Sequence, residues 1–289
     1  MLGKLIKYEW KSVSKFCFIA LLVLVGITLL GSIYYISPLW NGLMDLEESG
    51  ALGEGAIIPF LTGMTSFFAY ILVVVGVMYG AYLYLLIRFY RSMYSNEGYL
   101  THTLPVTPQQ LLISKLLVSG VWCFITEVVA CLSIFLLVFV FIWGLIPAGE
   151  RHWLMPEMFS GMKMTFEMAG INLTSFWLAV FLAALIGPFT SMSLYFCGIS
   201  LGQLAKSHRG LMAVLGCVGV YFVNWIVNFI VQMIVSMGTM ITMMSQYEYG
   251  RVTVMSPIGY YVQLVVMLAM GVGAFFLTRY IVSRKLNLT

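Results

Sequence analysis

Charged residues are scarce in this sequence. Of its 289 residues, 9% are Asp, Glu, Lys or Arg, whereas 61% are hydrophobic. A soluble domain of this length could not bury so much apolar surface in its own core. The composition therefore excludes an ordinary soluble protein and indicates a chain that uses a lipid bilayer as its solvent.

Motifs for catalysis are also missing. The sequence contains no GxxxxGK[ST] phosphate-binding loop, no HExxH and no GxSxG. Without these patterns the chain has no recognisable ATPase, metalloprotease or lipase site of its own. We expect no enzyme activity and no cofactor bound by this chain alone.

Cysteine and histidine give no sign of a disulfide or a metal site. There is no CxxC pair, and the three histidines lie in three different predicted loops on two sides of the membrane. All five cysteines fall in apolar runs: Cys17, Cys123, Cys131, Cys197 and Cys217.

Six stretches between the charges are long enough to cross a membrane, which takes about 20 apolar residues. They predict an all-α, polytopic membrane protein whose residues 1–289 form a single transmembrane domain. The predicted spans are 16–37, 58–88, 113–145, 173–204, 211–240 and 258–282.

The basic residues set the expected orientation. Twelve of the 15 Lys and Arg residues fall on one side of the predicted spans, and the loops of the other side are mostly acidic. Because Lys and Arg near span ends are retained in the cytoplasm, both termini are predicted to be cytoplasmic.

The N-terminal segment 1–15 has the pattern of an amphipathic helix. Its basic stripe is opposed by Trp10 and by aliphatic residues, which predicts an elbow helix at the membrane surface in contact with lipid. It could equally serve only as an orientation signal for the first span, or contact a partner. The lysines of the stripe are Lys4, Lys7, Lys11 and Lys15.

The predicted cytoplasmic loop 89–115 carries the clearest local signals. Residues 96–98 read as a turn. Thr107 then stands as an N-cap, with Pro108 at the first helical position and Gln110 completing a capping box. A short helix should begin there, and such a structured loop suits a docking element better than a passive connector.

Polar residues inside the predicted spans are few. Glu127 lies near the middle of the third span, where a carboxyl group is costly and marks a functional candidate. Asn224, Asn228 and Gln232 recur at every fourth position of the fifth span. Together these four residues could line a translocation path, or the amides could simply join helices by hydrogen bonds.

Two GxxxG pairs would let helices approach closely, Gly76 with Gly80 and Gly198 with Gly202. Such pairs are frequent in a chain with 27 glycines, so they are weak signals. The methionine-rich segment 153–168 is expected to form a helix at the outer interface.

Three segments together resemble the permease subunits of bacterial ATP-binding-cassette exporters of the type-2 membrane-domain family. They are MLGKLIKYEWKS at the start, EGYLTHTLPVTPQQLLISK at 97–115 and LGQLAKSHRG at 201–210. The middle segment is the most specific and looks like the coupling loop of Gram-positive members. The rest of the chain is similar in layout only.

The resemblance implies an elbow helix, a twelve-span dimer with an identical or paralogous permease half, and a loop that docks on a separate ATPase subunit. ATP and Mg would be bound by that ATPase, in the bacterial cell membrane, and no nucleic acid is implied. The implied coupling residues are Glu97, Gly98, Tyr99, Leu100, Pro105, Thr107, Pro108, Gln110, Lys206 and Arg209.

Two other functions fit the same topology. One is a membrane scaffold or regulatory subunit without transport of its own. The other is an ion-coupled secondary transporter, which would usually carry more intramembrane charge than this chain does. The cargo is not indicated by the sequence.

Overall fold

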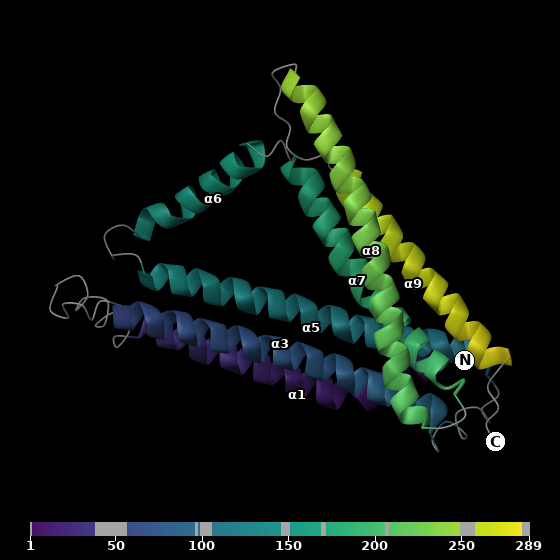
Figure 1. Ribbon diagram of the computed structural model, residues 1–289. Helices are drawn as coiled ribbons and strands as arrows, with labels where there is room; N and C mark the ends of the chain where they lie inside the picture. The colour runs from purple at the N-terminus through teal and green to yellow at the C-terminus, as the bar shows by residue number, and fades with distance from the viewer. Residues whose placement is uncertain are drawn as a thin grey trace. The chain divides into compact units, whose positions relative to one another are not determined.

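The computed structural model describes residues 2–37, 57–95, 98, 106–145, 151–168, 172–205, 208–248 and 258–284, and all regular structure in them is helical (Figure 1). The helices are α1 (Leu2–Ile36), α3 (Ile57–Tyr94), α5 (Pro108–Leu145), α6 (Arg151–Met168), α7 (Leu173–Gly202), α8 (Arg209–Glu248) and α9 (Ile258–Arg284).

Six of these helices are long and apolar enough to span a membrane: α1, α3, α5, α7, α8 and α9. They coincide in order and position with the six predicted spans, so the prediction of an all-α, polytopic membrane protein is confirmed. Several helices extend past the predicted ends of the spans. For example, α3 continues to Tyr94 and α8 to Glu248. The methionine-rich segment forms α6, whose described side chains are mostly exposed.

Two expected helix boundaries are absent from the structure. The elbow segment from Leu2 onward and the first span form one continuous helix, α1, and the short docking helix is the first part of α5 rather than a separate element. Neither junction contains a residue that would break the helix. No Gly or Pro occurs in the few residues after Ser12, and after Lys115 the first such residue is Gly120, which lies within α5. Once begun, a helix gains a hydrogen bond for each residue added.

The chain divides into two compact units, which are described separately. The second unit contains residues 13–83 and 125–159. Its core joins α1, α3 and α5 through Leu24, Val74 and Leu137, each almost fully buried. The hydroxyls of Thr28 and Tyr70 are hydrogen bonded across α1 and α3 at 3.0 Å.

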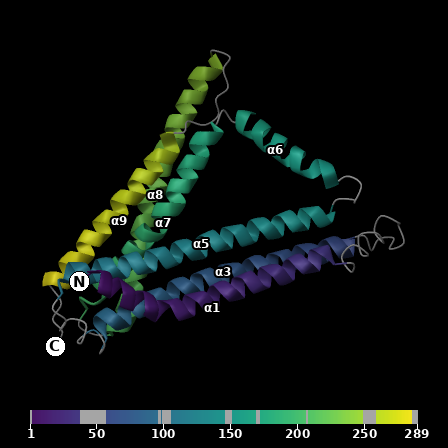
Figure 2. The same ribbon diagram turned by 180° about the vertical axis from the view of Figure 1, so that it is seen from behind.

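The first unit contains residues 1–12, 84–124 and 160–289. Within it α7 packs against both α8 and α9, and the three helices lie side by side in both views (Figures 1 and 2). A Cβ added to Gly202 would lie 2.3 Å from the Met212 carbonyl oxygen, and one added to Gly198 would lie 2.6 Å from Cys217 Cα. The Gly198 and Gly202 pair therefore brings the backbones of α7 and α8 together.

The other GxxxG pair behaves differently. A Cβ added to Gly76 or Gly80 would meet no atom within 4 Å in the described chain. The same four-residue spacing thus marks a close helix contact on α7 and an open surface on α3.

Candidate functional site

The residues implied for coupling are only partly described. Glu97, Tyr99, Leu100, Pro105 and Lys206 lie outside the described residues. Gly98, Thr107, Pro108, Gln110 and Arg209 lie within them, the last as the exposed first residue of α8.

The predicted start of α5 is confirmed. Pro108 is the first helical residue. Thr107 Oγ1 accepts a hydrogen bond from the Gln110 backbone N–H at 3.4 Å, and the Thr107 carbonyl accepts one from Leu111 at 3.2 Å. The side chain of Leu111 is buried, so the first turn of α5 is held by both its cap and its packing.

Of the turn predicted at residues 96–98, only Gly98 lies within the described residues, so the turn stays a prediction. The Gly98 N–H donates to the Ser95 carbonyl at 2.7 Å. A Cβ on Gly98 would lie 2.6 Å from the carbonyl oxygen of the fully buried Met93. Only glycine fits this close to the backbone of α3.

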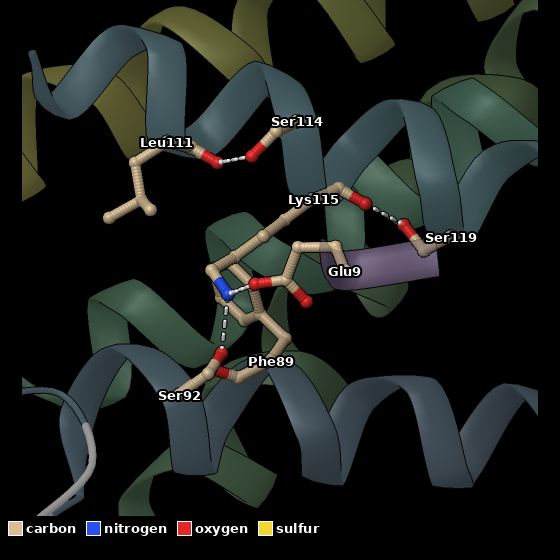
Figure 3. Close-up of polar contacts among 7 residues, drawn as sticks. All are labelled: Glu9, Phe89, Ser92, Leu111, Ser114, Lys115 and Ser119. Atoms are coloured by element: carbon tan, nitrogen blue, oxygen red, sulfur yellow. Dashed lines mark hydrogen bonds and ion pairs between the residues drawn. The ribbon is translucent and has the colours of Figure 1, made fainter. Parts of the chain in front are cut away.

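Between these two helix ends lies a buried polar group that we call the Lys115 cluster: Lys115 of α5, Glu9 of α1 and Ser92 of α3 (Figure 3). Lys115 Nζ forms an ion pair with Glu9 Oε1 and donates to Ser92 Oγ at 2.8 Å. The side chains of Lys115 and Glu9 are 4% and 18% exposed. Three helices are therefore joined at one charged centre.

The surroundings of the Lys115 cluster are tightly packed. The indole rings of Trp10 and Trp122 lie 4.9 Å apart and so pack α1 on α5. On α5 itself, Ser114 and Ser119 are buried and donate to the backbone carbonyls of Leu111 and Lys115 at 2.8 and 2.7 Å (Figure 3). Such small side chains leave room for the long Lys115 side chain between the helices.

The end of α3 is joined to α7 as well. The rings of Phe89 and Phe196 are stacked with centroids 3.7 Å apart, and the hydroxyls of Tyr94 and Ser200 are hydrogen bonded at 2.6 Å. The beginnings of α1 and α5 and the ends of α3 and α7 thus form one packed block within the first unit. We call it the helix-end block.

The predicted elbow has the expected two faces, with one difference. Lys4, Lys7, Lys11 and Lys15 are all exposed, whereas Trp10 is half-buried. The Trp10 ring packs on Trp122, and the place of this face at the membrane surface stays a prediction. The aromatic face of the segment thus contacts protein.

Sequence reasoning missed Glu9 and assigned no partner to Lys115. Two signals were available. Glu9 is the one acid in the basic segment before the first span. Lys115 lies on the same helical face as Leu111, Val118 and Trp122, which are all buried, and a charge on such a face needs a partner.

The residues of the expected translocation path fall in both units. In the second unit, the Tyr82 hydroxyl donates to Glu127 Oε1. In the first unit, Asn228 Nδ2 donates to the Asn224 carbonyl at 2.7 Å, and Gln232 is exposed. A pairing of Glu127 with the amides would join two units that are described separately, and it stays a prediction.

Comparisons with protein-family models, with curated proteins and with solved structures gave no match. The features of the chain itself indicate a multi-pass membrane protein, in which a buried ion pair joins α1 to α5 and a hydrogen bond from the same lysine joins α3 to them.

Proposed function

We propose that this chain is the permease subunit of an ATP-binding-cassette exporter, in which a separate ATPase subunit binds ATP and Mg. The proposal places both termini and the loop after α3 in the cytoplasm of a bacterial cell membrane. It includes a second permease half, identical or paralogous. The three segments 1–12, 97–115 and 201–210 carry the resemblance on which it is based.

The observation that supports it best is the Lys115 cluster. The loop that would dock on the ATPase leaves α3 near Gly98 and enters α5 at Thr107, and the cluster joins these two helices close to both points. Packed interiors transmit displacement rather than absorb it. A displacement of the loop would therefore move the end of α3 and the beginning of α5 together.

The chemistry of the cluster favours this role over a purely stabilising one. A buried ion pair often contributes no more stability than apolar side chains of the same volume, because both charges lose their water. What a buried ion pair can add is specificity, because each charge needs its partner in place and so disfavours other packings of the helices. We infer that Lys115 and Glu9 hold the helix-end block in a single register, as a transmitted movement requires.

Glu127 and the amides of α8 are the proposed lining of the path. The carboxyl group of Glu127 is hydrogen bonded to Tyr82, and the amides of Asn224 and Asn228 are hydrogen bonded to one another. Polar groups at membrane depth are costly, and those with satisfied partners can be retained next to a pathway without unfolding the helix.

The proposal expects an ATP-binding-cassette ATPase to be encoded beside this chain's gene, and the test is co-purification of the chain with that ATPase. The tagged chain should retain that ATPase through detergent purification, and Gln110→Ala should reduce the retained amount. Gln232→Ala is the matched control, because it removes an exposed amide from the middle of a span and should leave retention unchanged. A scaffold or an ion-coupled transporter would retain no ATPase, and equal retention by both variants would refute the assigned coupling segment.

A further inference from the structure

The first unit contains an apolar cavity between α7, α8 and α9. Its volume is about 560 Å³, and it is partly open at the surface. Leu194 of α7, Val220 and Val223 of α8, and Met270 of α9 are among its lining residues. The volume is in the range of about 300–1,000 Å³ that small-molecule sites occupy.

Two glycines keep this cavity open. Gly219 of α8 and Gly273 of α9 line it, and a Cβ added to either would meet nothing within 4 Å. By contrast, a Cβ added to Gly216, one turn before Gly219, would lie 2.2 Å from the Gly198 carbonyl oxygen. The backbones of α7 and α8 therefore touch at Gly216, beside the cavity.

A group of amides lies on the same two helices. We call it the amide cluster: Asn224 and Asn228 of α8 and Gln263 of α9. Asn228 Nδ2 donates to the carbonyl and to Oδ1 of Asn224, at 2.7 and 3.1 Å. Gln263 Nε2 donates to Asn228 Oδ1.

The direction of these hydrogen bonds leaves one acceptor open. The Asn224 carbonyl can only accept, so Asn228 must present its NH2 group there and its oxygen to Gln263. Gln263 must then donate through Nε2, and its Oε1 faces away from this bond. That Oε1 atom is buried and has no hydrogen-bond partner in the described part of the chain.

The amide cluster and the cavity lie on the same helix faces. Asn224 follows Val220 by four residues on α8, and Met270 follows Gln263 by seven on α9, spacings that place residues on one face of a helix. Seven residues of helix cover about 10 Å. The apolar cavity and the unpaired acceptor Oε1 thus lie along the same faces of α8 and α9, within the length of one elongated ligand.

We propose that this region binds an amphiphile, with its hydrocarbon chain in the cavity and a hydroxyl or amide N–H of its headgroup donating to Gln263 Oε1. The headgroup is uncharged, because none of the residues of the cavity lining or the amide cluster carries a charge and an unpaired ion there would be strongly disfavoured. The binding of an amphiphile at this site does not depend on the proposed function. The further assignment of the amphiphile as the exported cargo rests on the proposed function.

The test uses a monoacylglycerol with a photoreactive diazirine in its acyl chain. It is added to the purified chain in lipid nanodiscs, and crosslinked peptides are identified by mass spectrometry. Labelling should concentrate on the α8 and α9 peptides that contain Val220 and Met270 and should be displaced by unlabelled monoacylglycerol. Uniform labelling of all lipid-exposed helices, without displacement, would overturn the proposal.

Variants then test the two halves of the site separately. Gly219→Leu and Gly273→Leu place a side chain in the cavity from positions where a Cβ meets nothing within 4 Å, and they should lower labelling about tenfold. Gly238→Leu is the control, because a Cβ there also meets nothing within 4 Å but the residue does not line the cavity. Labelling that survives both filling variants would contradict the cavity as the site.

The headgroup contact is tested with Gln263→Leu against Gln109→Leu, because Gln109 lies near the start of α5 and belongs to neither the cavity lining nor the amide cluster. Loss of one hydrogen bond to the headgroup should weaken competition by unlabelled monoacylglycerol about fivefold in the first variant only. A diazirine fatty acid, which carries a carboxylate, should label the site more weakly than the monoacylglycerol. Equal labelling by both probes would overturn the assignment to uncharged amphiphiles. Neither measurement needs the ATPase, so its outcome is separate from that of the proposed function.

Discussion

Burying the Lys115 ammonium group and the Glu9 carboxylate costs free energy that their attraction only partly offsets. The two residues are 106 positions apart in the chain. Ser92 adds a third hydrogen-bonding atom from a third helix. At the scale of single residues, the cluster makes each partner dependent on the other two.

Replacing one partner of this ion pair should destabilise the protein more than replacing both. Lys115→Met leaves the Glu9 carboxylate in a largely buried site, and we expect a loss of stability on the order of 3 kcal/mol. Combining it with Glu9→Gln should restore much of that loss, as measured by thermal unfolding of the detergent-purified protein. Lys163→Met, at an exposed ion pair with Glu167, is the control and should leave Tm unchanged. A double variant as unstable as Lys115→Met would show that the two charges do not compensate one another.

Glu127 allows a second prediction. Glu127→Gln keeps a side-chain oxygen that can accept from the Tyr82 hydroxyl, so Tm should stay close to that of the unchanged protein. Glu127→Leu removes the acceptor and should cost about 1 kcal/mol. Equal Tm values for the two variants would mean that the Tyr82 bond contributes nothing to the second unit.

At the scale of helices, the contact of α7 with α8 depends on the absence of side chains. A Cβ on Gly202 would lie within 2.5 Å of backbone atoms of Met212 and Ala213, and backbone cannot move aside as a side chain can. Gly202→Ala should therefore destabilise the protein by about 1–3 kcal/mol.

Gly219→Ala is the matched control for Gly202→Ala. It makes the same substitution on α8, where a Cβ meets nothing within 4 Å, so no clash results. Thermal unfolding of the two variants in the same detergent is the measurement. A Tm for Gly202→Ala as high as that of the control would show that α7 and α8 do not approach as closely as described.

The helices themselves could be predicted from the sequence, because bilayer thickness and the gaps between charges fix where a span can lie. The start of α5 could be predicted too, since Thr107 and Pro108 act through local backbone chemistry. The continuity of α1 and α5 could not, because no local signal separates a short helix from the first turns of a long one.

Long-range partners were beyond such reasoning. Whether Lys115 meets Glu9, or Asn228 meets Gln263, depends on how helices far apart in the sequence pack. A charged residue on an otherwise buried helix face needs a partner, but the sequence of that helix does not indicate which residue the partner is. For the same reason the sequence could not show that, among the described residues, the Gly198 and Gly202 pair makes a contact and the Gly76 and Gly80 pair makes none.

For the whole molecule, the central claim is that the loop between α3 and α5 faces the cytoplasm and contacts an ATPase. The most direct measurement replaces single tyrosines by the photoreactive residue p-benzoylphenylalanine in cells that also express the proposed ATP-binding-cassette ATPase partner. Tyr99 lies in the proposed docking loop, and Tyr249 lies in a loop predicted on the opposite side of the membrane. The account predicts a crosslink to the ATPase from position 99 and none from position 249. A crosslink from position 249, or none from position 99 when the ATPase co-purifies, would contradict it.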